Sequence, residues 1–444
     1  LFEALNRVLL DHIWQVRQAA CYSLPGVFAI QPRNNARREN LLLIMRALKQ
    51  DISPNVQLAA FEMIGEIIYL FHDDENGVPD ELVRLFMGKP MDAHDEGNDV
   101  NEFLTNSDYA LIVAFNFPAV VLTLGPEQWS RLRELYKRLT THAHDNVRNS
   151  LAASLHQMAK IIGPKATCQD LIPVSDQFFR DTCVDVTATM LEHMDEFWLM
   201  LPVEAAREQL LRVPALWLTD YAHEWRLRQS IAAHIPALIP TMLLGDEDGC
   251  LITLSLLALN DPVNALRNIG IQCVPITYRT FREHDDTIAD GFLSMLCDMA
   301  HASTSRQRTT FLNIVQSLLE HDLSRERFER LILPCLLELA VDGVSDVNIA
   351  LARTVQQVWL LGWYNNETMP AALRQVVATL LIAPTLTVQE FMQSLDPPIL
   401  THDMQPMPLN KRHPLVFGPA PPILDNTIIP MPHSDESEHS TEVL

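Results

Sequence analysis

Histidines and clustered acidic residues are the side chains of this 444-residue sequence that could bind a metal ion. His142 and His144 flank an expected turn, but no further ligand follows them at a fixed spacing. The zinc motif HExxH begins at His223 but fails at Leu227, where its second His would stand. The acidic run 246–249 lacks the alternating acids and the distal Glu of a calcium loop. We therefore predict no metal site and no cofactor.

Nucleophile and phosphate-binding motifs do not occur either, since GxSxG, GxGxxG and GxxxxGK[ST] are missing. The sequence thus predicts a protein that is not an enzyme. Its seven Cys are scattered without a CxxC pair, which favours reduced thiols in the cytosol or the nucleus. The longest apolar stretch, 110–124, contains Asn116 and Pro118 and is short for a bilayer span. Because the first residue is Leu1, we expect the true N-terminus to be missing.

The composition limits the classes of fold and function that remain for this chain. The chain has 33 Lys+Arg against 56 Asp+Glu, a net charge of −23, which argues against binding to nucleic acid. A hydrophobic fraction of 48% is enough for a folded core, and only 14 Gly argue against a turn-rich β fold. Surface recognition of another protein is the kind of function that remains.

An internal repeat of about 40 residues determines the expected architecture. One aliphatic position, here called the anchor, recurs with an Asp five residues before it in several copies, and the residue eight after it is apolar in all nine copies. Neighbouring anchors are 38 to 41 residues apart, except for one interval of 53. The anchors are Val16, Val56, Tyr109, Val147, Val186, Leu227, Leu266, Gln307 and Val347.

Each copy is typical of two antiparallel helices joined by a turn, with the second helix starting near the anchor. Apolar residues at anchor, +4 and +8 line one face of a helix, and a small residue at +3 lets a neighbour approach closely. A single hairpin cannot bury its apolar face, so about nine hairpins must stack. The sequence predicts an all-α solenoid over residues 1–383. Pro25, Pro118, Pro236 and Pro275, nine after their anchors, are predicted to kink the second helices.

The pattern LPxLLxLxxD followed by D-x4-V-R resembles the HEAT repeat. Residues 115–163, which read FNFPAVVLTLGPEQWSRLRELYKRL and later HDNVRNSLAASLHQMAKIIG, resemble the regulatory subunit 1 family of serine/threonine-protein phosphatase 4, itself similar to the scaffold A subunit of phosphatase 2A. The resemblance implies a non-catalytic scaffold whose partner is a phosphatase catalytic subunit. The catalytic signatures GDxHG and GNHE are absent, so the chain would bind a phosphatase without being one.

Two sets of residues take roles from this resemblance. The Asp before each anchor and the Arg after it would form a hydrogen-bonded ladder between repeats, with interruptions at Gln57, Thr187 and Asn348. The ladder residues are Asp11, Arg17, Asp51, Arg148, Asp181, Arg228, Asp261, Arg267 and Asp342. The turns within repeats would contact the partner, and the candidates there are Trp14, Asn55, Asn146, Trp225, Arg306 and Asp346.

An acidic insert and a Pro-rich tail stand outside the repeat pattern. The insert, about residues 72–108, carries eleven acids and two bases; within it we expect a short helix over 79–87 and a mobile loop over 91–107. The tail, 384–444, has eleven Pro among 61 residues and is predicted to be disordered. Both are either solvated surfaces or contacts for a partner.

These features favour a scaffold that binds a phosphatase catalytic subunit of the phosphatase 4 type and directs it to phosphoprotein substrates. The alternative is a HEAT-type nuclear transport receptor or another protein–protein adaptor, because an acidic insert would suit basic cargo. Neither hypothesis involves nucleic acid or a membrane. Both place the protein in the cytoplasm, the nucleus or both.

Overall fold

The computed structural model describes residues 2–91, 100–245, 249–321, 323–383 and 386–393. Its secondary structure is helical throughout these ranges, and no strand occurs in them. The all-α prediction is therefore confirmed. The chain divides into two compact units, residues 1–209 and 210–444, which are described separately.

The first unit is a stack of helical hairpins. Its first-layer helices are α1 (Phe2–Leu9), α4 (Asn35–Lys49), α7 (Asp80–Phe86), α10 (Trp129–Thr140) and α12 (Ile172–Phe178). Its second-layer helices are α2 (Trp14–Tyr22) with α3 (Leu24–Ala29), α5 (Pro54–Glu62) with α6 (Ile64–Tyr69), α9 (Ser107–Leu124), α11 (Asp145–Ala166), and α13 (Val184–Glu192) with α14 (Met194–Leu199). The connecting elements are α8 (Val100–Thr105), η1 (Pro126–Gln128), the π-helix η2 (Thr167–Leu171) and α15 (Val203–Leu210), which reaches the boundary.

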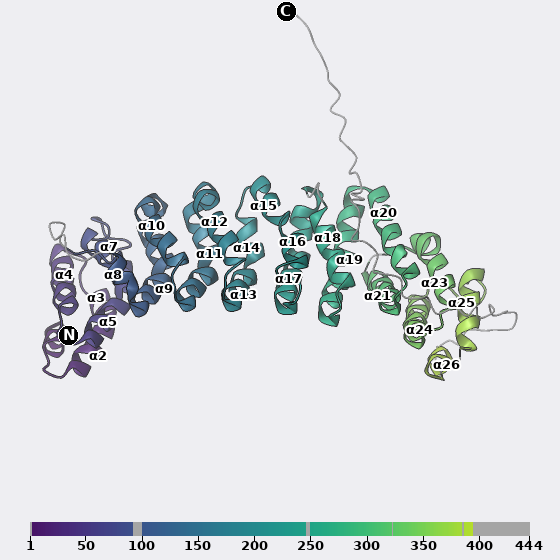
Figure 1. Cartoon of the computed structure of the whole chain (residues 1–444), viewed down its shortest axis with the longest axis horizontal. Helices are drawn as coiled ribbons and strands as arrows, with labels where there is room; N and C mark the ends of the chain where they lie inside the picture. Colours follow the sequence, from purple (N-terminus) through teal and green to yellow (C-terminus); the bar gives the residue numbers. More distant parts are fainter. Residues whose placement is uncertain (1, 92–99, 246–248, 322, 384–385, 394–444) are drawn as a thin grey trace, which may run out of the picture. The chain divides into compact units, whose positions relative to one another are not determined.

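The second unit repeats the plan. Its first-layer helices are α16 (Val213–Leu218), α18 (Cys250–Asn260), α20 (Asp286–Cys297), α22 (Arg325–Arg327) continuing into η5 (Phe328–Ile332) and α23 (Leu333–Leu339), and α25 (Ala371–Leu381). Its second-layer helices are α17 (Trp225–Met242), α19 (Asn264–His284), α21 (Ser305–His321), α24 (Ser345–Leu360) and α26 (Leu386–Gln393). The short helices η3 (Leu243–Gly245) and η4 (Asp298–His301) extend α17 and α20. Within each unit, Figure 1 shows the two kinds of helix on opposite sides of the stack.

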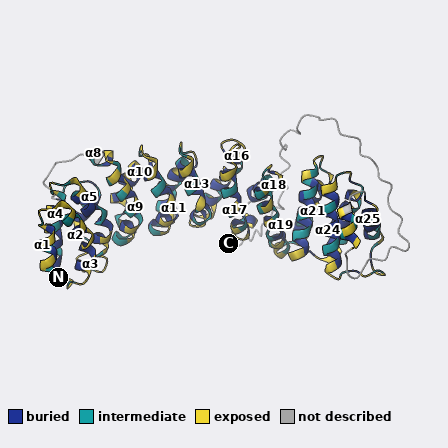
Figure 2. Cartoon of the chain, turned by 90° about the horizontal axis from the view of Figure 1, so that it is seen from below, coloured by how far each residue is buried: buried dark blue, intermediate teal, exposed yellow. Residues whose placement is uncertain are grey.

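The core lies between the two layers, as the repeat pattern requires, and Figure 2 shows buried residues on the helices of each unit. The nine residues eight after the anchors are all at most 2% exposed, because they face the first-layer helices: Leu24, Ile64, Phe117, Leu155, Met194, Ile235, Val274, Val315 and Val355. Burying a large apolar side chain contributes about 1.5 to 3 kcal/mol. Repetition of this contact along the chain, with no single central core, is what stabilises each unit.

An aromatic cluster packs α7, α9 and α10 together in the first unit. Phe117 lies at its centre, with ring centroids 5.6 Å from Phe86, 6.4 Å from Trp129 and 5.0 Å from Tyr136. The rings meet edge to face, the arrangement that aromatic quadrupoles favour. Three helices that are separate in sequence are thus joined through one side chain.

The breaks in the second-layer helices do not follow the proline positions. Pro118, Pro236 and Pro275 lie inside the continuous helices α9, α17 and α19. The interruptions fall instead seven residues after an anchor, at Ser23, Met63 and His193, and the last two have no proline nearby. The breaks at Met63 and His193 therefore do not arise from proline, and the proline kinks expected in α9, α17 and α19 stay a prediction.

The borders of the insert and the tail also differ from the prediction. Helix α7 is the expected short helix, but α8 occupies part of the predicted loop 91–107. Helix α26 lies in the predicted tail, because Val388 and Met392 are buried where α26 packs on α24 and α25. The rest of the loop, 92–99, and of the tail, 394–444, lies outside the described residues.

Helix α9 is long and apolar enough, by length and composition alone, to cross a membrane. It begins three residues earlier than the apolar stretch seen in the sequence and so reaches 18 residues. In the structure it packs against α6 and α11 within the stack, and Ala110, Val113 and Phe117 are fully buried. These contacts are those of a core helix, although Phe115 and Leu122 on its other face are exposed.

Candidate functional site

The turns inside the repeats present the residues predicted to contact a partner. Each of the six occupies the first or second position of a second-layer helix, and all are exposed. We call Trp14, Asn55 and Asn146 the turn row of the first unit, and Trp225, Arg306 and Asp346 the turn row of the second unit. A row of helix N-terminal turns exposes backbone N–H groups as well as side chains to a partner.

Five turns, three of which carry turn-row residues, are shaped by ladder aspartates. One carboxylate oxygen of each accepts a hydrogen bond from the backbone N–H two residues further on, at 2.8–2.9 Å. This local bond is the reason that Asp is favoured in turns. It occurs in five repeats, at Asp11, Asp51, Asp181, Asp261 and Asp342.

Arginines that follow the anchors join one turn to the next. Arg148 donates from Nε and Nη2 to the two carboxylate oxygens of Asp181, both at 2.7 Å, and from Nη1 to the carbonyls of its own turn. Arg17 binds Asp51 in the same way, and Arg228 binds Asp261 with Nε–Oδ2 at 2.9 Å. Such paired, bidentate bonds fix orientation as well as distance, so they hold the turns in line.

Two arginines depart from the predicted ladder. Arg267 donates to the carbonyls of Asp261 and Pro262 in its own turn and to Asn264, but to no carboxylate of the next repeat within the described residues. The reason is that the equivalent position of the next turn is Ala302. Arg308 was not predicted, yet its Nε lies 2.6 Å from Oδ2 of Asp342. Arg308 follows Gln307, which is a polar anchor, so the motif of an aliphatic anchor followed by Arg is not recognisable at this point of the sequence.

At the three predicted interruptions, the substituted side chains stay within their own repeat. Gln57 donates to the carbonyl of Asp51 at 2.6 Å, and Asn348 donates to that of Asp342 at 3.2 Å. Thr187 donates to the carbonyl of Phe178 at 3.0 Å. Gln57 and Asn348 replace the bond of the arginine to the carbonyl six residues earlier, whereas Thr187 bonds a carbonyl nine residues earlier, at the end of α12. None of the three bonds the next turn within the described residues.

The arginine bonds change the ionisation of their partners. The hydrogen bond from Arg17 lowers the pKa of Asp51. Burial acts to raise the pKa of Asp181, but bonds from Arg148 and the backbone of Cys183 outweigh it, and the net pKa is lowered. Both carboxylates are therefore charged across the neutral range.

We expect acid to destabilise the first unit through these two groups. A carboxylate with a depressed folded pKa contributes stability that is complete above its unfolded pKa, about 4, and is lost as pH falls through the folded value. Urea unfolding followed from pH 7 to about pH 2 should show the loss below about pH 4. In Asp181→Asn the dependence should be shallower, and an unchanged slope would contradict the assignment.

Exposed apolar side chains accompany the turn rows. Trp14 and Trp225 are each 37% exposed, and the Arg226 guanidinium lies 4.9 Å from the Trp225 ring centroid. Ile52 is 98% exposed in the turn before α5, and Val184 is half exposed at the start of α13. Neither Ile52 nor Val184 was among the predicted contact residues, although each is an aliphatic residue beside an Asp in the sequence.

Comparison with known proteins adds to this geometry. A family model described as the middle domain of protein phosphatase 4 regulatory subunit 1 matches residues 113–216. Serine/threonine-protein phosphatase 4 regulatory subunit 1 of Homo sapiens and that of Mus musculus are each 29% identical over 258 residues, which is 57% of this chain and 27% of theirs. The chain spans about a quarter of the length of the curated relatives that it matches.

Solved structures support the fold. Kap121p bound to RanGTP matches with a TM-score of 0.53 at 16% identity, covering 88% of this chain and 40% of that chain. Kap121p bound to Ste12p matches with a TM-score of 0.50 at 15% identity, covering 89% and 42%. At this identity the likeness shows the HEAT-repeat fold and nothing of the function.

The two kinds of comparison therefore bear on different points. The structural likeness confirms the HEAT-repeat fold, and the sequence likeness runs through α9, α10 and α11, where the resemblance was first seen. The predicted resemblance is confirmed: along 57% of its length the chain is similar to regulatory subunit 1 of serine/threonine-protein phosphatase 4.

Proposed function

We propose that this chain is a regulatory scaffold that binds the catalytic subunit of a phosphatase 4-type serine/threonine phosphatase. The observation that carries the proposal is the similarity to phosphatase 4 regulatory subunit 1 over 258 residues. The match of residues 113–216 to the middle domain of the same family agrees with it. We further propose that the complex resides in the cytoplasm, the nucleus or both; the seven free cysteines support a reducing compartment.

The scaffold acts through position and supplies no reacting group. Its turn rows offer aromatic, amide and charged side chains on rigid helix ends, and the ladder pairs keep neighbouring turns in register. A catalytic subunit held there meets phosphoproteins bound to the same scaffold at a raised effective concentration. Direction of the phosphatase to phosphoprotein substrates is thus part of the proposal.

Purification tests the proposal directly. The full chain carrying an affinity tag should recover a phosphatase catalytic subunit in near-stoichiometric amount, quantified by mass spectrometry. The isolated chain should show no phosphatase activity of its own. Recovery of no catalytic subunit would reject the proposed function.

The aromatic members of the turn rows should contribute most of the affinity. We expect Trp14→Ala combined with Trp225→Ala to weaken binding of the purified catalytic subunit at least tenfold, because buried Trp side chains dominate interfaces at about 2 kcal/mol or more each. The measurement is surface plasmon resonance with the variant chain immobilised.

The matched control removes exposed apolar side chains from the opposite layer. Leu43 on α4 is 61% exposed and Leu218 on α16 is 49% exposed, and both belong to first-layer helices. Leu43→Ala with Leu218→Ala should bind like the unmodified chain. If both double variants weaken binding equally, the turn rows are not the contact.

A HEAT-type nuclear transport receptor, or another adaptor, is the alternative. The Kap121p structures share the fold with this chain, and one of them is bound to RanGTP. A direct binding assay with a Ran-type GTPase in its GTP state distinguishes the two functions. We expect no binding; saturable, nucleotide-dependent binding would favour the alternative.

A further inference from the structure

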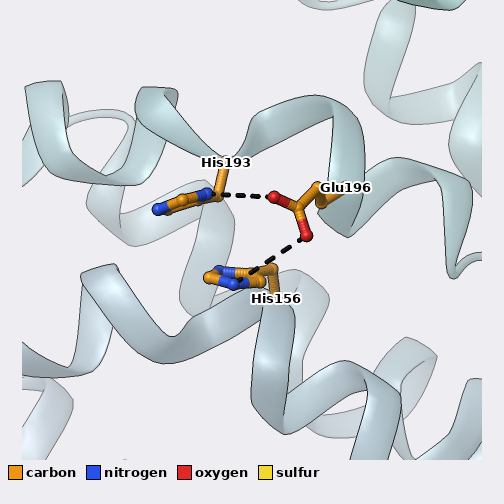
Figure 3. Close-up of side chains that lie close together, drawn as sticks. All are labelled: His156, His193 and Glu196. Carbon is orange, nitrogen blue, oxygen red and sulfur yellow. Dashed lines mark hydrogen bonds and ion pairs between the residues drawn. The ribbon is translucent and has the colours of Figure 1, made fainter.

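Three possible metal ligands from two neighbouring repeats meet in the first unit. His156 lies on α11, His193 stands at the break between α13 and α14, and Glu196 follows on α14. Nδ1 of His193 is 3.2 Å from Oε1 of Glu196, and Nε2 of His156 is 4.0 Å from Oε2. All three ligand atoms lie within 4.8 Å of one another. Figure 3 shows the two imidazoles stacked and the carboxylate beside both, one oxygen toward each ring.

The His156 imidazole is buried, and its Nε2 nitrogen faces Glu196 without forming a hydrogen bond to it. Its side chain is 7% exposed, and Nδ1 makes no hydrogen bond to any described residue. The contact of Nε2 with Glu196, at 4.0 Å, is too long for a hydrogen bond. Leaving a polar group buried and unpaired costs about 1 to 3 kcal/mol, so it calls for a physical reason. A cation between Nε2 of His156 and the Glu196 carboxylate would give Nε2 a partner, while Nδ1 would stay unpaired.

The surroundings keep His156 and Glu196 in the forms that bind cations. Burial lowers the pKa of His156, and the neighbouring His193 lowers it further. Hydrogen bonds from Lys160 and His193 lower the pKa of Glu196 to about 2. Neutral imidazole and ionised carboxylate are the states in which these groups ligate metals.

We propose that His156, His193 and Glu196 bind a Zn²⁺ ion that links the α11 repeat to the α13–α14 repeat. Two imidazoles and one carboxylate suit zinc, with water as the fourth ligand. Zinc–ligand bonds of about 2.0–2.2 Å require the side chains to draw together. His193 and Glu196 are 39% and 43% exposed, so they are free to do so.

The positive charge of Lys160 repels a cation and therefore lowers the affinity of the site for the ion. Its Nζ lies 2.7 Å from Oε2 of Glu196, the oxygen that faces His156. Binding requires this ammonium to leave, and its side chain is 47% exposed and can turn toward solvent. If Lys160 only forms a structural salt bridge, its removal does not raise the affinity for Zn²⁺. If Lys160 competes with a bound ion, its removal raises that affinity.

The experiment is titration of the purified full chain, first stripped with a chelator, with Zn²⁺ by isothermal calorimetry and with Co²⁺ by visible absorption. We expect one site in the unmodified chain, and intense absorption bands of low-coordinate Co²⁺. His156→Ala and His193→Ala should each weaken Zn²⁺ binding at least tenfold, and Lys160→Met should strengthen it roughly tenfold, because it removes an adjacent positive charge.

The matched control is the other stacked histidine pair of this unit. His142 and His144 have ring centroids 5.5 Å apart but belong to no described metal-ligand group, so His142→Ala with His144→Ala should bind Zn²⁺ unchanged. Circular dichroism shows whether each variant folds. If His156→Ala does not fold, His193→Ala still tests the site, because His193 is partly exposed and its replacement disturbs the core less. Absence of binding, equal binding by all variants, or weaker binding by Lys160→Met would each overturn the proposal.

Discussion

Replacing Arg148 with Ala is expected to lower the free energy of unfolding of the first unit by about 3 to 5 kcal/mol. The side chains of Arg148 and Asp181 are 10% and 4% exposed, so the change leaves a buried carboxylate without its counter-charge. It also removes the donor from the carbonyls of His142 and Ala143. Urea unfolding followed by circular dichroism measures the loss as a lower midpoint.

An exposed pair of the same type supplies the control. Arg33 and Asp73 lie 3.3 Å apart in the same unit, with side chains 54% and 58% exposed. Solvent screens such a pair, and Arg33→Ala should cost at most about 1 kcal/mol. Midpoint shifts of similar size in the two variants would show that burial does not govern the ladder.

The second large effect is expected at the centre of the aromatic cluster. Phe117 is fully buried, and Phe117→Ala should cost about 3 to 5 kcal/mol, because α7, α9 and α10 lose their shared contact and a cavity remains. Thermal and urea unfolding measure this cost. The fluorescence of Trp129, which packs on Phe117, should change in the folded state as well.

Its control lies two residues away on the same helix. Phe115 is 76% exposed, so Phe115→Ala removes the same side chain with the same change in helix propensity but without a cavity. It should alter stability by less than about 0.5 kcal/mol. A larger loss in Phe115→Ala than in Phe117→Ala would contradict the layer assignment of α9.

The repeat was predictable from sequence because its strongest signal is the burial of one helix face. Phe117 and Met194, eight residues after their anchors, proved as buried as the most regular positions. Ladder partners were less predictable, because each pair needs two correct residues one repeat apart. Arg267 has the right type but faces Ala302 where the next turn would offer a carboxylate, whereas Arg308 bonds Asp342 but follows an atypical anchor.

Features that depend on contacts between repeats left little trace in the sequence. The helix break at His193 has no proline beside it and so could not be predicted from the sequence. His156 lies in another repeat, so its proximity to His193 does not appear as a short sequence motif. Helix α26 was assigned to the tail because composition there is Pro-rich, yet two well-placed apolar side chains suffice to dock it.

The uneven ladder has a mechanical consequence. In the second unit, buried ion pairs join α17 to the turn before α19 and α21 to the turn before α24. Between them, where Arg267 bonds only its own turn, the described residues offer the neutral hydrogen bond from Gln307 to Asn260. We therefore expect the second unit to be stiffer at its two ion-paired joints than between α19 and α21, because a neutral hydrogen bond is weaker than a buried charged one.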